Sequence, residues 1–191
     1  MVDFTITSAW YDSAALAAVN EQLTQERVVQ LSSFFIEPLG QLPPAKHLKR
    51  EERPGFAVRT TGPALLTELW HSLLLADWLA QATAAHWELR SCRHECYGPG
   101  DYSLLHDSEV GEQRLLLMYD LTEQPQALNG GHNIFSFADG MQTTCNRETG
   151  ALVLALLAAG DLECMRYVSK LSSGTVRLEH AQFRQSQPIT Q

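Results

Sequence analysis

The sequence predicts an α+β fold in which N-terminal helices back a jelly-roll of two β-sheets. Helical patterning dominates up to Ala85, whereas from Trp87 onward short runs of strand-forming residues follow one another, separated by turn signals. Helices followed by a series of strands are the element order of a sheet sandwich that helices cover on one side. We therefore expect one domain over residues 1–191, with helical support in 12–85 and a β core in 87–183.

The N-terminal part is expected to form two helices. Residues 12–26 are rich in Ala and Leu, and Asp12 or Ser13 can cap the helix. Residues 63–85 begin with a proline, which a first helical turn tolerates, and place Leu and Trp at spacings of three and four residues. This spacing predicts a helix with a wide apolar face.

The remaining segments are assigned from residue type. We expect an irregular, proline-containing connection at 36–54, whose charged residues 46–53 form a solvated face, and a loose tail at 185–191. Strands are expected where β-branched, aromatic and other apolar residues lie between turn residues such as Gly98-Pro-Gly and Asn129-Gly-Gly. The expected strands are 27–35, 56–60, 87–97, 102–107, 113–121, 132–138, 141–145, 151–159, 163–171 and 175–183.

Composition excludes some classes of protein. The chain has 191 residues, 45% of them hydrophobic, and a formal net charge of −8, which disfavours a non-specific nucleic-acid binder. The N-terminus lacks the pattern of a signal peptide, and the longest apolar run, residues 151–160, is too short to span a bilayer. Four cysteines without an export signal favour reduced thiols, so we expect a cytoplasmic or nuclear protein.

One motif, Tyr97–Ser108 (YGPGDYSLLHDS), resembles the iron-binding strand of the Fe(II)/2-oxoglutarate oxygenases. These enzymes hold iron with two His and one carboxylate, and the first two ligands are supplied as His-x-Asp. Residues i and i+2 share one face of a strand, but here the partner of His106 is Ser108, a poor metal ligand. Asp107 is a carboxylate one residue too early. The resemblance therefore implies the fold, with one ligand lost.

The following segments are similar to prolyl hydroxylases in the same order. Residues 113–121 resemble the apolar strand after the first ligands, 129–135 the Gly-Gly turn, and 146–154 the strand before the distal His. Counting back from Gly174, the distal ligand falls at Arg166, whose permanently charged guanidinium cannot coordinate a cation.

Residues 10–35 resemble the start of the second domain of the eukaryotic ribosomal-protein prolyl 3-hydroxylases. That domain is a double-stranded β-helix that has lost its iron site and is linked to regulation, degradation or partner binding. The resemblance implies a non-catalytic domain that binds a protein partner or a catalytic oxygenase domain. It implies no catalytic, cofactor-binding or metal-binding residue, no Fe(II) and no 2-oxoglutarate. The vestigial positions are His106, Ser108, Arg166 and Arg177.

Several other residues are candidates for chemistry. Cys92, His94 and Cys96 share one face of a predicted strand, but a structural zinc site needs four ligands and no second pair of cysteines is present. His132 and His180 are interpreted as surface or hydrogen-bonded sheet histidines. Cys164 could join His106 and Asp107 only if the strand were bulged. Arg177 lies about where the family binds its cosubstrate, or else pairs with Glu179 in solvent.

Two alternatives remain open. The first is an active Fe(II)/2-oxoglutarate-dependent prolyl hydroxylase with an atypical metal site, against which Ser108 and Arg166 count. The second is a cupin-like binder of a metal or small ligand, which needs several His inside the barrel, and only His106 is well placed.

Overall fold

The computed structural model describes residues 5–36, 47–53, 55–106, 113–165 and 167–186. Among these residues, four helices precede β4 (Trp87–Tyr97) in the chain: η1 (Ser8–Tyr11), α1 (Ser13–Glu26), α2 (Thr67–Trp70) and α3 (Leu73–Thr83). A further short helix, η3 (Pro125–Ala127), lies between later strands. The strands are β1 (Val28–Leu31), β2 (Lys49–Arg53), β3 (Ala57–Pro63), β4 (Trp87–Tyr97), β5 (Tyr102–Ser103), β6 (Arg114–Asp120), β7 (Asn133–Ser136), β8 (Gln142–Cys145), β9 (Leu152–Leu157), β10 (Leu162–Met165) and β11 (Val176–Gln185).

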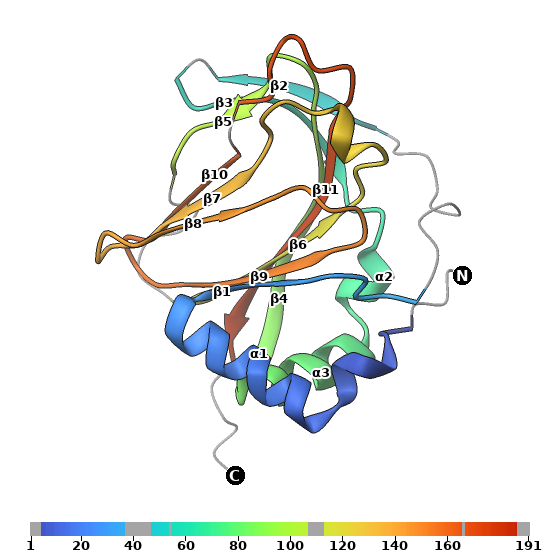
Figure 1. Cartoon of the computed structure of the whole chain (residues 1–191), viewed down its shortest axis with the longest axis vertical. Coiled ribbons are helices and arrows are strands. Elements are labelled where there is room, and N and C mark those ends of the chain that lie inside the picture. The colour runs from blue at the N-terminus through green and yellow to red at the C-terminus, as the bar shows by residue number, and fades with distance from the viewer. Residues whose placement is uncertain (1–4, 37–46, 54, 107–112, 166, 187–191) are drawn as a thin grey trace.

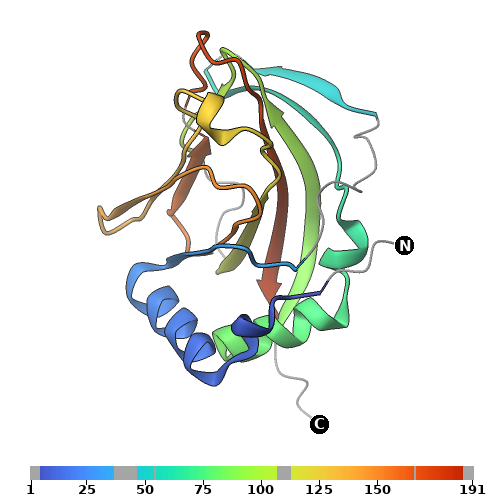
Figure 2. The same ribbon diagram turned by 45° about the vertical axis from the view of Figure 1, so that its right-hand side comes forward.

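Within these ranges the strands form two antiparallel sheets. The larger sheet has the order β1-β9-β6-β11-β4-β3-β2, with β5 paired to β3, and the smaller has the order β10-β7-β8. The two sheets face each other across the interior, and the helices lie together at one end and outer side of the larger sheet (Figures 1 and 2). The predicted helix-backed double-stranded β-helix is therefore confirmed.

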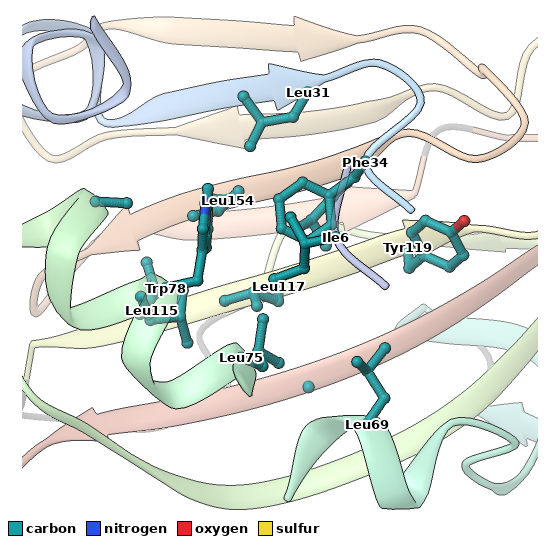
Figure 3. Packing of buried hydrophobic residues seen from close by; sticks show 14 of the residues in the cluster. Ile6, Leu31, Phe34, Leu69, Leu75, Trp78, Leu115, Leu117, Tyr119 and Leu154 are labelled. Atoms are coloured by element: carbon teal, nitrogen blue, oxygen red, sulfur yellow. The ribbon is translucent and has the colours of Figure 1, made fainter. Parts of the chain in front are cut away.

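The larger sheet is buried on both faces, because alternate residues of its strands enter different cores. On β6, Leu115 and Leu117 pack with the helices, whereas Leu116 and Met118 pack toward the smaller sheet. This burial explains why β6 reads as a nearly continuous apolar run instead of an alternating one. Figure 3 shows the helix-side core, in which Trp78 and Leu75 of α3 lie beside Leu115 and Leu117 of β6.

Two sequence-based assignments in the N-terminal part are wrong. Residues 63–85 do not form one helix: Pro63 ends β3, α2 ends at Trp70, and Ser72 caps a separate helix α3 by accepting a hydrogen bond from the Leu75 N–H. The segment 36–54 is not wholly irregular, since β2 pairs with β3 through the backbone. The sequence of β2, KREER, shows no alternation of apolar and polar residues because four of its five side chains are exposed at the edge of the sheet.

The Gly-Gly turn before β7 is needed because the backbone approaches closely there. Gly130 has a φ of +93°, and a Cβ at this position would collide with the carbonyl oxygen of Tyr167. The turn forms an isolated bridge with Val168, which ties the start of β7 to the segment after β10.

A buried ionic contact attaches α2 and the segment before it to the larger sheet. Glu179 of β11 accepts hydrogen bonds from the backbone N–H groups of Leu65 and Leu66, both at 3.1 Å, and from Trp70 Nε1 at 3.4 Å. Its Oε1 also lies 2.8 Å from Nδ1 of His94, and the His94 and Glu179 side chains are both 0% exposed. Several donors thus compensate the cost of burying this carboxylate.

Helix α3 offers a matched test of the helix-side core. Leu75 is 0% exposed, whereas Leu73, two residues earlier on the same helix, is 87% exposed. We expect Leu75→Ala to lower the free energy of unfolding by about 2–5 kcal/mol and Leu73→Ala to change it by less than about 0.5 kcal/mol. Urea denaturation of both variants measures this, and equal losses would contradict the packing described.

The His94–Glu179 pair predicts how stability depends on pH. Burial alone lowers the pKa of His94, but hydrogen bonds to Cys96 and Glu179 outweigh burial and raise it from 6.5 to about 9. Because the folded pKa is the higher one, this stabilisation is complete below pH 6.5 and is lost as the pH rises to about 9. We expect a loss on the order of 3 kcal/mol across this range.

Chemical denaturation at several pH values checks this prediction. The His94→Gln variant should lose this dependence, whereas His71→Gln, which alters an exposed histidine, should keep it. An unchanged pH dependence in His94→Gln would show that His94 is not the titrating group.

Candidate functional site

A polar pocket with about 300 Å³ of open space lies between the two sheets, at the end where the apolar inner core stops. Strand alternation supplies its walls, since every second residue of β4 and β11 faces inward. It is lined by Arg59, Arg93, Glu95, Tyr97, Ser103, His106, Met118, Asn133, Phe135, Glu163, Leu178 and His180.

On one side of the pocket, His106, Glu163 and His180 come together. The backbones of His106 and Glu163 form an isolated antiparallel bridge, with N···O distances of 3.1 and 3.2 Å. Oε1 of Glu163 lies 3.3 Å from Nε2 of His180 and 3.9 Å from Nε2 of His106. One carboxylate from β10 thus faces two imidazoles, one of them on β11.

The surroundings of these groups resemble those of metal ligands. Nδ1 of His106 lies 2.7 Å from the carbonyl oxygen of Leu104, which turns Nε2 toward Glu163. Oε2 of Glu163 is buried and has no hydrogen-bond partner in the part of the chain that the structure describes. Two imidazoles and one carboxylate are also the ligand types that iron-dependent oxygenases use.

The charge state of Glu163 agrees with such a role. Burial alone raises the pKa of its carboxyl, but His180, His106 and Arg93 together outweigh burial and hold the pKa below the ordinary value. Among the described residues, no three His, Cys, Asp or Glu side chains already stand in an arrangement that could hold a metal. The types of ligand fit Fe(II), but these side chains would have to rotate to surround the ion. The strands that carry them already have the required register.

The opposite side of the pocket is a buried network around Glu95. Nη1 of Arg59 donates to Glu95 and to the Tyr97 hydroxyl, both at 3.0 Å, and Tyr97 donates to Glu95 at 2.9 Å. Arg93 also donates to Glu95. Burial alone raises the pKa of Glu95, but Arg93, His180 and Arg59 outweigh it and leave the pKa far below the ordinary value. Nε of Arg59 also donates to Oε2 of Glu51 at 2.9 Å, so two arginines and two carboxylates balance each other on this side.

The structure places the predicted site residues in different environments. His106 lines the pocket, whereas Arg177 lies outside its lining and pairs with Glu123 at 3.0 Å, not with Glu179. Asp107, Ser108 and Arg166 lie outside the described residues.

Of the two interpretations of His180, the hydrogen-bonded sheet histidine is the one the structure shows: its side chain is buried on β11, with Nε2 3.3 Å from Oε1 of Glu163. His132 is partly buried and is not among the residues that line the pocket. Cys164 pairs with Ile134 through the backbone of β10.

Sequence reasoning missed Glu163, Arg59 and Arg93. For Arg93 a signal existed: if Cys92, His94 and Cys96 share one face of β4, then Arg93 and Glu95 share the other. Glu163 was missed because the distal position was counted back from Gly174. The bridge with His106 shows that the residue opposite His106 lies three positions earlier than that count.

Comparisons with known proteins identify the fold. No family model matches the chain, and no curated protein matches it. Among solved structures, a 2OG-Fe(II) oxygenase family oxidoreductase from Burkholderia pseudomallei aligns with a TM-score of 0.70 at 11% identity, covering 88% of this chain and 90% of that one. A prolyl-4-hydroxylase from Pseudomonas putida has a TM-score of 0.65 at 18% identity, covering 90% and 99%.

A third similar structure contains a bound peptide. It is a prolyl hydroxylase from Trichoplax adhaerens in complex with a hypoxia-inducible factor oxygen degradation domain fragment, with a TM-score of 0.70 at 10% identity, covering 93% of this chain and 92% of that one. Identities this low show the fold alone, which is the double-stranded β-helix of 2-oxoglutarate oxygenases.

These comparisons overturn two expectations drawn from the sequence. The chain was expected not to be an enzyme and to need neither Fe(II) nor 2-oxoglutarate, whereas the similar structures are named as Fe(II)/2-oxoglutarate oxygenases and prolyl hydroxylases. The expectations rested on Ser108 and Arg166 at the expected ligand positions, set His180 aside as a candidate and did not consider Glu163. In the folded chain, Glu163 and His180 lie beside His106 instead.

Proposed function

We propose that this protein is a Fe(II)- and 2-oxoglutarate-dependent oxygenase with an atypical metal site that hydroxylates a prolyl residue of a protein. The observation that carries the proposal is the carboxylate of Glu163, which faces Nε2 of both His106 and His180 and leaves Oε2 buried without a partner. These three side chains would hold the iron. When bound, Fe(II) with 2-oxoglutarate and O₂ supplies the oxidant for insertion of oxygen into a C–H bond.

The remaining pocket residues have roles that follow from their charge. Arg93, whose side chain is more exposed than that of Arg59, is the guanidinium on this wall that would meet the dicarboxylate cosubstrate, whereas Arg59 is held between Glu51 and Glu95. Phe135, Met118 and Leu178 exclude water from the same space. Arg177 does not take part, because its guanidinium pairs with Glu123 outside the pocket lining.

The proposed substrate is a protein because the resemblances of the sequence and of the fold both point to prolyl hydroxylases. One similar structure holds a peptide of another protein. The likeness of residues 10–35 to the ribosomal-protein prolyl 3-hydroxylases extends the proposal to a ribosomal protein as the partner. A cytoplasmic or nuclear location would accord with that partner.

Metal binding tests the ligand set directly. Under anaerobic conditions, calorimetric titration with Fe(II) should show binding that His106→Ala and Glu163→Gln each weaken by at least about tenfold. His71→Ala, which removes an exposed histidine outside the pocket lining, should bind as the unmodified chain does. Equal affinity in all four proteins would refute this ligand set.

Turnover tests the reaction. With Fe(II), 2-oxoglutarate and a digest of ribosomal proteins, we expect succinate formation and addition of one oxygen atom to a prolyl residue, detected by mass spectrometry. Both products should disappear in Glu163→Gln and persist in His71→Ala. If iron binds but no peptide is hydroxylated, the metal site stands and the prolyl substrate is wrong.

A further inference from the structure

A second group of chemically reactive side chains lies on the face of β4 that points away from the pocket. Sγ of Cys96 lies 3.2 Å from Nε2 of His94, and Nδ1 of His94 lies 2.8 Å from Oε1 of Glu179. A thiol, an imidazole and a carboxylate thus stand in line. This is the arrangement in which a carboxylate orients a histidine and the histidine activates a nucleophile.

The side chain of Glu179 is held in place by several hydrogen bonds. It accepts from the backbone N–H groups of Leu65 and Leu66 and from Trp70 Nε1. Because its Oε1 lies 2.8 Å from Nδ1 of His94 and both side chains are fully buried, it orients the Nδ1–H of His94 toward itself. The other ring nitrogen, Nε2, is then the one that meets the sulfur of Cys96.

Cys96 lies beside an imidazole and is partly open to solvent. Burial alone lowers the pKa of His94, but its hydrogen bonds raise that pKa to about 9, so the ring is an imidazolium at neutral pH. Arg177 of β11 is the cross-strand partner of Cys96, so its side chain leaves the sheet on the same face. Cys96 is a free cysteine with partial exposure, which lets a small reagent reach the sulfur.

We propose that Cys96, whose proton passes to Nε2 of His94, is oxidised by hydrogen peroxide to a sulfenic acid, which makes it a modification site separate from the pocket. The sulfur attacks one peroxide oxygen, so an S–O bond forms while the O–O bond breaks. The leaving hydroxide takes the proton of the His94 imidazolium and departs as water. The sulfur is oxidised by two electrons and the peroxide is reduced by the same two.

The other described cysteines provide internal controls. Cys92 lies on the same face of β4, but burial and the charge of Glu179 raise the pKa of its thiol. Cys145 is buried, and burial raises the pKa of its thiol to about 11. Neither should react as Cys96 does. Cys92 and Cys96 are four residues apart on one strand, about 13 Å between their Cα atoms, so they cannot form a disulfide with each other.

The site has a direct structural connection to the pocket. Cys96 lies between Glu95 and Tyr97 on β4, and both of these line the pocket on the other face of the sheet. An added oxygen on Cys96 alters the hydrogen bond to His94 and thereby the strand that positions Glu95. Peroxide would in this way act on the pocket from outside it.

The test uses the complete, folded chain. The protein is treated briefly with limiting hydrogen peroxide, sulfenic acid is trapped with dimedone, and each cysteine peptide is quantified by mass spectrometry. We expect Cys96 to be trapped at least about tenfold more than Cys92 or Cys145. A parallel reaction with limiting iodoacetamide should give the same preference.

Two variants separate the mechanism from simple exposure. Cys92→Ser should leave labelling of Cys96 unchanged, whereas His94→Gln should reduce it toward the level of Cys92, with circular dichroism as the check of folding. If His94→Gln does not fold, the proposal is tested by the relative labelling of Cys96, Cys92 and Cys145 in the unmodified chain. Labelling of Cys96 at or below that of Cys92 would overturn the proposal.

Discussion

Burial of the larger sheet on both faces is the constraint on which the rest of the structure depends. Strands β6 and β9 send alternate side chains to the helices and to the smaller sheet, so two cores share one layer of backbone. Strand β11 sends Ala181 and Phe183 to the helix side, whereas its Leu178 and His180 line the pocket. This requires the register of each strand to be correct, because a shift by one residue would exchange the two sets of side chains. The helices and the smaller sheet are then placed by the sheet that they cover.

The pocket exists because polar side chains replace apolar ones on the inner face at one end of this sheet. A charge inside a sandwich is costly unless it is paired, and the structure pairs nearly all of them. Arg59 and Arg93 share Glu95, and His180 meets Glu163. Within the pocket, Oε2 of Glu163 has no hydrogen-bond partner among the described residues, at the point where two imidazoles converge. An unsatisfied buried atom of this kind indicates a site that binds something.

Strand β4 links the two reactive regions of the molecule. Its odd-numbered residues Arg93, Glu95 and Tyr97 face the pocket, whereas His94 and Cys96 face the helical side. Glu179 of β11 serves the helical side in two ways, since it anchors the segment around α2 and also orients His94. A change in the contact between Glu179 and His94 therefore alters both the attachment of the helices and the position of β4, which forms one wall of the pocket.

The sequence by itself determined the fold class and most of the strands. The segment 87–97 matches β4 at both ends, and 12–26 differs from α1 only at its capping residue Asp12. These predictions succeeded because period-2 patterns, helix caps and glycine turns are local properties. The strand β2 and the break between α2 and α3 depend instead on backbone pairing and on packing against the sheet, which override local pattern.

The candidate site was decided by tertiary structure. The sequence singled out His106, but its partners come from strands that lie far away along the chain, and only the bridge between His106 and Glu163 shows which residue faces it. His180 and Arg59 likewise enter the pocket through the pairing of β11 and β3 with β4. A motif that is continuous in sequence can be read from the chain, whereas a group of side chains assembled across strands depends on a register that only the folded sheet sets.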